Sequence, residues 1–303
     1  MTDKIKLLSI LGSVRCGSTL LDRLLGQFPD TISIGESIFV WELGFLQNQL
    51  CACGASFLEC SFWSAVREKI KNEISLEDIK DLAKWGRQLL SFRNPLDVGI
   101  TNLRLKKLDI FYRAIYDVSG ASLIVDSSKS SRYAEILNTF PGTELSAVHL
   151  VRDSRAVAFS LLRNKLLLSD VRQEAYMNKF PTWRSAIHWN LQNISADILK
   201  MKNYVKCFSL LRYEKFVCEP ANIADQIRIF TGMNMNVPYD SFIENQEVIL
   251  KPGHGISGNP MRFKTGKLKI VLDQEWQASM YRSDKVLVTI LTFPLLLKYG
   301  YFG

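Results

Sequence analysis

The sequence lacks the long apolar runs and leader patterns that would direct a chain into a membrane or out of the cell. No segment offers about eighteen uninterrupted apolar residues, and Met1–Lys6 shows no signal-peptide pattern. Gly/Ser-rich linkers, internal repeats and low-complexity tracts are also missing, while 303 residues with 47% hydrophobic content can bury a core that needs no crosslinks. We therefore expect one soluble domain, residues 1–303, in the cytoplasm and without a membrane partner.

Cysteine and histidine are scarce. The six cysteines of a chain without an export signal are expected to be thiols rather than a disulfide framework. Cys51, Cys53 and Cys60 stand close together in the sequence and invite a zinc interpretation. A closed structural zinc site needs four ligands, however, and none of the three histidines is near these cysteines in the sequence. We therefore expect no metal.

The charge is unbalanced towards the basic side. The chain has 38 Lys and Arg against 30 Asp and Glu, a net charge of +8, which suits a site for a multiply anionic nucleotide. A solvated basic surface would give the same number. No basic tract with interleaved aromatic residues is present, so nucleic acid is not an expected partner.

The first motif is a candidate phosphate-binding loop. An apolar run, Leu7–Leu11, predicts a strand that leads into a loop beginning at Gly12, and leucines at helical spacing follow. Gly12 and Gly17 have the spacing of a Walker A loop, but Ser18 occupies the position of its lysine and the cation is instead Arg15. The missing lysine disfavours an ATPase or kinase.

Alternating strand and helix patterns follow further along the chain. They predict strands at Leu123–Val125, Leu145–Val151 and Cys207–Leu211 and helices at Arg132–Phe140, Ala156–Lys165 and Thr182–Lys202. Such βα repeats predict an α/β, P-loop-like three-layer fold in which helices flank a central parallel sheet. Residues 38–119 are expected to form a helical insertion that caps the site and contributes to an acceptor pocket.

Two motifs carry a resemblance to a known family. Residues 14–21, Val-Arg-Cys-Gly-Ser-Thr-Leu-Leu, resemble the 5′-phosphosulfate loop of sulfotransferases that use 3′-phosphoadenosine 5′-phosphosulfate (PAPS), in its Arg-containing bacterial and tyrosylprotein-type form. Residues 149–160 are similar to the 3′-phosphate motif of that family, with Arg152 at a strand end and Ser160 eight residues later. Eight residues span a little over two helical turns, so a folded-back turn can bring both side chains onto one phosphate.

The resemblance implies PAPS as sulfuryl donor, without a metal, and a set of residues that hold it. The late segment Lys251–Phe263 looks like the loop that closes over the 3′-phosphate in bacterial sulfotransferases, and Tyr213 lies in an Arg-Tyr-Glu segment that matches a nucleotide contact. The implied donor-binding residues are Arg15, Cys16, Gly17, Ser18, Thr19, Arg152, Ser160, Tyr213, Ser257, Asn259 and Arg262.

The resemblance also assigns candidate catalytic residues. Glu36, in a Gly-Glu element, is the expected general base, although a carboxylate there would also suit a helix start. Lys129, just beyond a buried strand, is expected to face the sulfuryl group, with a solvated loop lysine as the alternative. Arg15 would stabilise the leaving phosphate, and His254 is the second candidate base.

The expected function is sulfuryl transfer to a hydroxyl, or to an amine or carbamoyl nitrogen, of a small-molecule acceptor. The chain departs from the steroid-type enzymes, which have lysine in the first loop, and from the membrane-anchored Golgi enzymes, so specialised (natural product) metabolism is the expected setting. Residues 38–119 and 166–181 should set acceptor specificity. A P-loop-like nucleotide kinase and a catalytically silent nucleotide-binding module remain the alternatives. The resemblance gives the cysteine-rich loop before Trp63 a local structural role.

Overall fold

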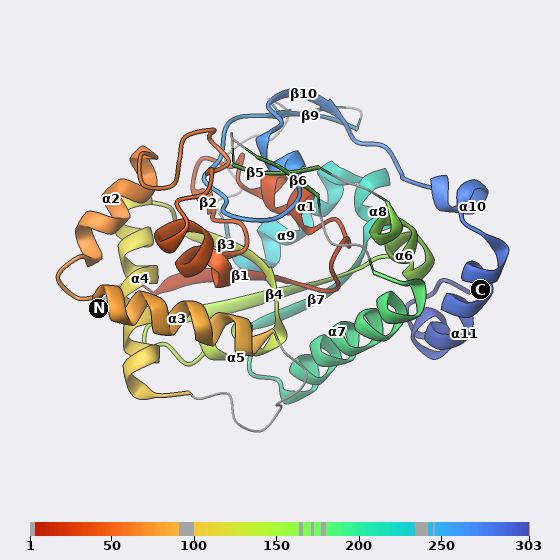
Figure 1. Ribbon diagram of the computed structural model, residues 1–303, viewed down its shortest axis with the longest axis horizontal. Helices are drawn as coiled ribbons and strands as arrows, with labels where there is room; N and C mark the ends of the chain where they lie inside the picture. The colour runs from red at the N-terminus through yellow and green to blue at the C-terminus, as the bar shows by residue number, and fades with distance from the viewer. Residues whose placement is uncertain are drawn as a thin grey trace.

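A five-stranded sheet forms the centre of the protein (Figure 1). The computed structural model describes residues 4–90, 100–163, 166–170, 173–176, 180–233, 242–244 and 246–302. The strand order is β2-β3-β1-β4-β7, and every neighbouring pair is parallel. The strands are β1 Ile5–Leu11, β2 Thr31–Ser33, β3 Leu123–Lys129, β4 Thr143–Val151 and β7 Cys207–Arg212. The predicted α/β fold with a central parallel sheet is confirmed.

Helices cover both faces of this sheet. In β1, Leu8 and Ile10 belong to one hydrophobic cluster, whereas Ile5 and Leu7 belong to another, because successive side chains of a strand point to opposite faces. The first cluster includes residues of α1, α8 and α9, and the second includes residues of α5 and α7, which gives the three layers seen in Figure 1. These helices are α1 Ser18–Leu25, α8 Tyr213–Cys218, α9 Pro220–Thr231, α5 Ser131–Leu137 and α7 Thr182–Lys202.

Most of the predicted elements are present with shifted ends. The helix predicted for residues 182–202 has those bounds, whereas β3 continues through Asp126 to Lys129. The helix predicted from Ala156 is α6, Ser154–Leu162, and residues 164 and 165 of that prediction lie outside the described residues. Asp153 caps α6, since its carboxylate accepts from the Arg155 backbone N–H at 2.8 Å.

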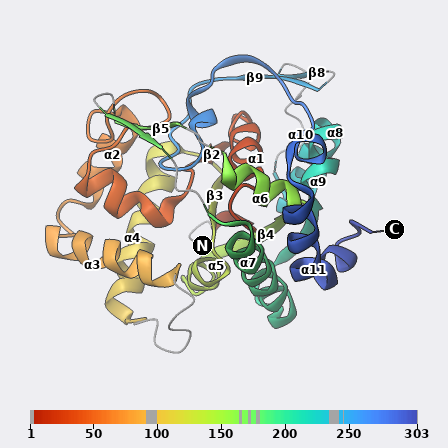
Figure 2. The same ribbon diagram turned by 45° about the vertical axis from the view of Figure 1, so that its right-hand side comes forward.

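The segment 38–119 is mainly helical where the structure describes it, and residues 91–99 lie outside that part. Its elements are η1 Ser37–Phe39, the π-helix η2 Val40–Leu46, α2 Ser61–Ile70, α3 Leu76–Leu89 and α4 Asn102–Ser119. Helix α3 begins at a capping box in which Ser75 and Asp78 satisfy each other's backbone N–H groups. Figure 2 shows α2, α3 and α4 grouped together on the side of the molecule away from α11, Arg282–Lys298.

The region after α9 holds short elements that return to the sheet. Ile256 forms a parallel bridge with Gly35, and this places the segment Lys251–Phe263 beside the end of β2. The remaining elements are the strand pair β5 Leu166–Asp170 and β6 Gln173–Tyr176, the small sheet of β8 Ile243–Glu244, β9 Glu247–Leu250 and β10 Gly266–Lys269, and the helices η3 Pro260–Phe263 and α10 Glu275–Ser279. None of these strands was predicted from the sequence.

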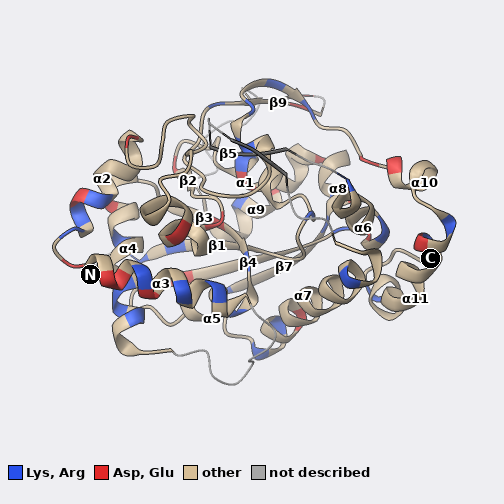
Figure 3. Ribbon diagram, viewed as in Figure 1, with Lys and Arg blue, Asp and Glu red and all other residues tan. Residues whose placement is uncertain are grey.

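The sequence raised the questions of membrane-spanning segments and of where the excess positive charge lies. Among the described residues, no helix combines the length and the apolar composition needed to cross a bilayer. Figure 3 shows lysine and arginine scattered over the outer helices, including α2, α3, α4 and α7, together with acidic positions. The excess positive charge is therefore not confined to one helix.

The carboxyl group of Asp22 makes the stability of the folded protein depend on pH. It lies on α1, is 2% exposed and accepts a hydrogen bond from the Ser33 hydroxyl. Burial raises the pKa of Asp22 from its ordinary 3.8 to about 7. Because the folded state holds this proton more tightly than the unfolded chain does, the stabilisation is complete below about pH 4 and is lost as the pH rises through about 7.

We expect Asp22→Asn to remove this dependence, because the amide stays neutral and can still accept from Ser33. Between about pH 4 and pH 8, the free energy of unfolding of the wild-type protein, measured with urea, should fall by on the order of 1–4 kcal/mol. The fall measured for Asp22→Asn should be smaller by a similar amount. Equal losses in the two proteins would show that Asp22 is ionised in the folded state throughout.

Candidate functional site

The carboxyl ends of all five parallel strands meet at one cavity. It has a volume of about 1210 Å³. The residues that reach it from the carboxyl ends of β1, β2, β3, β4 and β7 are, in that order, Arg15, Glu36, Lys129, Arg152 and Tyr213. Open α/β sheets bind their ligands at this edge, where successive loops diverge. Four of these five residues are charged, so this edge of the sheet can interact with a charged ligand.

The loop from Gly12 to Gly17 depends on the absence of side chains at its two ends. A Cβ atom on Gly12, whose φ is 137°, would lie 2.3 Å from the Leu150 carbonyl oxygen of β4. A Cβ atom on Gly17, whose φ is 98°, would lie 2.4 Å from the Tyr213 ring. Gly17 is also the N-cap of α1, so the first N–H groups of that helix, which have no partner within it, lie beside the cavity.

Arg152 follows β4 directly and lines the cavity. Its guanidinium is held over the Tyr213 ring at 4.5 Å, donates to the Arg15 carbonyl oxygen at 3.2 Å and pairs with Asp273 at 3.0 Å. The residue is only 6% exposed, and its Nε atom is buried but has no hydrogen-bond partner. Ser160 of α6 is 3% exposed and lines the same cavity, as the spacing from Arg152 predicts. Asp273 follows no motif and was not predicted.

Glu36 and Lys129 form an ion pair in the cavity. Lys129 Nζ lies 2.6 Å from Glu36 Oε1, and the two side chains are only 10% and 14% exposed. Lys129 has a φ of 65°, a left-handed conformation that places it at the end of β3 with its Nζ also donating to the Ser127 carbonyl oxygen. Glu36 is the N-cap residue of η1, but its side chain makes no capping hydrogen bond. The carboxylate therefore points to the cavity rather than to the helix start.

A buried polar network supports this pair from behind. The Asp126 carboxylate accepts from the Tyr112 hydroxyl at 2.7 Å, from the Ser128 backbone N–H at 2.7 Å and from the Ser37 hydroxyl. Burial raises the pKa of Asp126. Because Ser37 follows Glu36 and Ser128 precedes Lys129, the network fixes both backbone segments that carry the ion pair.

The late loop closes one wall of the cavity. Arg262 is 4% exposed and donates to the Gly258 carbonyl oxygen at 3.2 Å, and burial lowers its pKa to about 10. A Cβ atom on Gly258 would lie 3.2 Å from Glu36 Oε1 and 3.4 Å from Thr19 Oγ1. The Asn259 backbone N–H donates to that Thr19 hydroxyl at 3.5 Å. The structure therefore brings the late loop against both the phosphate loop and the candidate base.

Burial also marks Arg15 as part of the site. Desolvation lowers the pKa of Arg15, the nearby Glu36 opposes this effect, and Arg152 adds to it. Arg15 and Arg152 therefore repel each other in this partly desolvated cavity, and an anionic ligand would relieve this repulsion.

Two of the predicted site residues are not in the cavity. Cys16 is 0% exposed and packs in the hydrophobic cluster behind the loop, so its side chain cannot contact a ligand there. Of the five loop residues predicted to hold the donor, the other four, Arg15, Gly17, Ser18 and Thr19, line the cavity. His254 is absent from the lining, and its Nδ1 lies 3.3 Å from Cys60 Sγ. The placement of His254 is thus a correction to its predicted role as second base.

The opposite wall comes from the insertion and carries residues that no motif marked. Phe39 and Leu43 supply apolar surface, and Arg87 of α3 pairs with Glu42 of η2 at 3.3 Å. Phe180, in the segment 166–181, also lines the cavity but packs against the cluster of Val151, Val157 and Leu161. Residues 171, 172 and 177–179 of that segment lie outside the described part. These positions could not be found from the sequence. Helical periodicity does not show which positions of a helix line a cavity that is formed together with distant loops.

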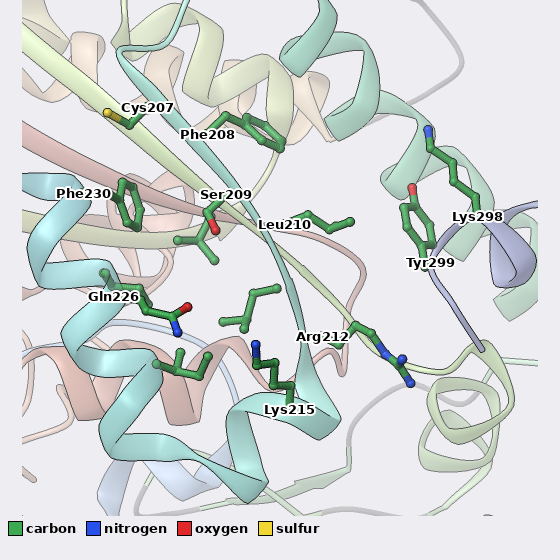
Figure 4. Close-up of a pocket in the computed structure, with 14 residues that line it drawn as sticks. Cys207, Phe208, Ser209, Leu210, Arg212, Lys215, Gln226, Phe230, Lys298 and Tyr299 are labelled. Carbon is green, nitrogen blue, oxygen red and sulfur yellow. The ribbon is translucent and has the colours of Figure 1, made fainter. Parts of the chain in front are cut away.

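A second cavity of about 500 Å³ lies along β7 between α9 and the end of α11 (Figure 4). Two of its cations have partners in this structure: Arg212 donates to the Gly300 carbonyl oxygen, and Lys298 pairs with Asp197 at 2.6 Å. Strand β7 is an edge of the sheet, and none of the predicted site residues lines this cavity. The chemistry therefore belongs to the larger cavity.

Comparisons with known proteins agree with the architecture. The structure is similar to the sulfotransferase domain of the Synechococcus PCC 7002 olefin synthase, with a TM-score of 0.54, 18% sequence identity and coverage of 97% of this chain and 96% of that chain. It is also similar to the sulfotransferase domain from the curacin biosynthetic pathway, with a TM-score of 0.49, 15% identity and coverage of 96% and 99%. Among curated proteins no relative matches. A family model described as the sulfotransferase family matches residues 8–237. The chain belongs to the sulfotransferase family.

Proposed function

We propose that the protein transfers the sulfuryl group of PAPS to a hydroxyl, or to an amine or carbamoyl nitrogen, of a small-molecule acceptor. The observation that carries this proposal is the meeting of Arg15, Lys129, Arg152 and Glu36 in one cavity at the carboxyl edge of the sheet. A sulfuryl donor needs cations at both phosphate ends, and an acceptor needs a base. The cavity supplies both.

The residues fit a donor that carries a 3′-phosphate. Arg152 has a buried Nε without a hydrogen-bond partner, and Ser160 lines the same part of the cavity. Arg262 and Ser257, on the late loop, would complete that side. The 5′-phosphosulfate would lie at the loop of Gly17, Ser18 and Thr19, where the start of α1 favours negative charge.

Each charged residue has a separate task in this proposal. When bound, PAPS supplies a sulfur centre whose bond to the bridging oxygen of the 5′-phosphate breaks as the acceptor oxygen or nitrogen bonds to sulfur. Glu36 accepts the proton that the acceptor loses, and Lys129 holds the carboxylate in place at 2.6 Å. Arg15 neutralises the charge that develops on the departing phosphate. In this scheme cations of the protein provide the charge stabilisation.

The acceptor would lie against the wall formed by the insertion. That wall combines the apolar Phe39 and Leu43 with the Glu42–Arg87 pair, so it suits a small molecule with an apolar body and a polar substituent. Residues 38–119 would then act as the cap that sets acceptor specificity. Specialised metabolism in the cytoplasm is the setting that we propose.

Isothermal titration with 3′-phosphoadenosine 5′-phosphate, AMP and Mg-ATP tests the donor assignment. We expect 3′-phosphoadenosine 5′-phosphate to bind at least about a hundredfold more tightly than AMP, because only the former offers a 3′-phosphate to Arg152. A preference for Mg-ATP would favour the nucleotide kinase alternative. Selective binding without any sulfuryl transfer to a panel of phenols, alcohols and amines would favour a catalytically silent module.

A further inference from the structure

Three cysteines and one histidine meet outside the proposed catalytic cavity. Cys51 and Cys53 lie between η2 and α2, Cys60 is the N-cap residue of α2, and His254 comes from the late loop. Their three sulfur atoms and one ring nitrogen all lie within 4.8 Å of one another. The Nδ1 atom of His254 is 3.3 Å from Cys60 Sγ and 3.9 Å from Cys51 Sγ. We call these four residues the Cys3His cluster.

The sequence expectation failed here because distance along the chain hid the fourth ligand. His254 follows Cys60 by 194 residues, so no short spacing pattern links them. The late loop nevertheless returns to the cysteines, since the Ala52 backbone N–H donates to the Gly255 carbonyl oxygen at 3.1 Å. The argument that a zinc site lacks a histidine no longer holds.

The surroundings fix the orientation of the cluster. The Phe62 ring stacks on the His254 ring with centroids 4.9 Å apart, and the Trp63 indole N–H donates to the His254 carbonyl oxygen at 2.8 Å. Cys51 and Cys60 are 0% and 1% exposed. Two fixed, buried thiols that face an imidazole nitrogen are positioned like ligands rather than like apolar core residues.

The cysteine-bearing turn is also held by its backbone. The Cys51 N–H donates to the Ala55 carbonyl oxygen at 2.9 Å, and the Gly54 N–H donates to the Cys51 carbonyl oxygen at 2.9 Å. Gly54 has a φ of 94°, which a glycine adopts without strain and which lets the chain reverse just after Cys53. The reversal places Cys51 and Cys53 on the same side of the turn, facing Cys60.

We propose that the Cys3His cluster binds one Zn²⁺ in a closed, structural site. Zinc in such sites is tetrahedral, with bonds of about 2.3 Å to sulfur and about 2.0–2.1 Å to nitrogen, so ligand atoms should lie about 3.5–3.8 Å apart. The separations of 3.3 Å and 3.9 Å to His254 Nδ1 bracket this spacing. Three thiolates and one imidazole are the soft-to-borderline ligands that favour zinc over magnesium or calcium. On binding, the three thiols release their protons to solvent, and Nδ1 offers its lone pair.

The proposed metal would fasten the insertion to the late loop. Beyond His254, the chain pairs with the end of β2 through Ile256 and then carries Ser257 and Arg262 into the cavity. Arg262 also donates to the Leu50 carbonyl oxygen, one residue before Cys51, at 3.3 Å. Zinc would therefore anchor the wall of the cavity that faces the nucleotide without itself touching a substrate.

Metal analysis of the full-length protein, purified without added metal and without a metal-affinity column, tests the proposal. We expect one equivalent of zinc per chain by inductively coupled plasma mass spectrometry. Removal of zinc with a strong chelator under reducing conditions should lower the thermal midpoint by about 5 °C or more, because the binding energy of a structural metal is folding energy. Readdition of zinc should restore the midpoint.

Matched variants locate the site. Cys60→Ser and His254→Ala should each lose most of the bound zinc, whereas Cys218→Ser, which changes an exposed cysteine outside the cluster, should keep one equivalent. If the ligand variants fail to fold, Co²⁺ added to wild-type apoprotein decides the question. Strong visible bands with a sulfur-to-metal charge-transfer band would support a tetrahedral site with thiolate ligands, and their absence would contradict it.

Three results would overturn the assignment. The first is wild-type protein with little zinc and three reactive thiols at these positions, and the second is a disulfide between Cys51 and Cys60 in a non-reducing peptide map. The third is a full equivalent of zinc in His254→Ala, which would exclude a site with four protein ligands. None of these measurements depends on sulfuryl transfer, so the zinc proposal and the proposed function can fail independently.

Discussion

Glu36→Gln is expected to lower kcat by about a hundredfold or more while nucleotide affinity stays within about threefold of wild type. The glutamine keeps the size of the side chain and can accept a hydrogen bond from Lys129, but it cannot take the proton of the acceptor. Because Glu36 lies beside the phosphate loop rather than behind it, the nucleotide contacts of Arg152 should survive. Initial rates at saturating PAPS, together with titration of 3′-phosphoadenosine 5′-phosphate, separate the two effects.

Glu42→Gln is the matched control for this substitution. Glu42 is a carboxylate of the insertion that also lines the cavity, but it pairs with Arg87 rather than with Lys129. Its loss should act mainly on the KM for the acceptor. If Glu36→Gln turns over normally, or if Glu42→Gln loses as much kcat, the base is not Glu36. The placement of His254 in the Cys3His cluster would then leave deprotonation by the substrate itself as the first alternative.

The motifs predicted the site residues whose positions follow from their spacing along one strand, loop and helix. Arg152 directly follows β4 and Ser160 lies on α6, the next element, so a fixed spacing determines their relative position. Glu36 and Lys129 were assigned through the family resemblance, and the fold explains why they meet, because both follow parallel strands whose carboxyl ends lie at one edge of the sheet. The Glu36–Lys129 distance of 2.6 Å shows this meeting.

Other features depend on contacts that a local pattern does not encode. Cys16 belongs to the phosphate-loop motif, but the turn conformation directs its side chain into the core, and spacing alone does not reveal that direction. Asp273 reaches Arg152 from a segment without a motif. His254 meets the cysteines because the late loop pairs with the end of β2, which is itself only three residues long and was not predicted. Long-range loop placement therefore limits what the sequence alone predicts.

Arg152→Ala is expected to weaken binding of 3′-phosphoadenosine 5′-phosphate by about 2–4 kcal/mol, or about 30- to 1000-fold, because a charge-assisted contact to the 3′-phosphate is lost. The affinity for AMP should change far less, since AMP has no 3′-phosphate. Titrating both nucleotides into both proteins therefore isolates the contact: the preference for the 3′-phosphate should collapse in the variant. Arg152→Lys should recover only part of it, because lysine keeps the charge but loses the planar fork.

The comparison of the two nucleotides also separates recognition from structure. Arg152 stacks on Tyr213 and bonds to the Arg15 carbonyl oxygen, so its removal can loosen the phosphate loop as well. A loosened loop would weaken AMP and 3′-phosphoadenosine 5′-phosphate by similar factors, whereas a lost 3′-phosphate contact weakens only the latter. Arg163→Ala, at a partly exposed arginine that pairs with Glu275 and does not line the cavity, should leave both affinities unchanged. If the affinities for the two nucleotides fall by similar factors, Arg152 acts by holding the phosphate loop. The residues that bind the 3′-phosphate would then be Arg262 and Ser257 of the late loop.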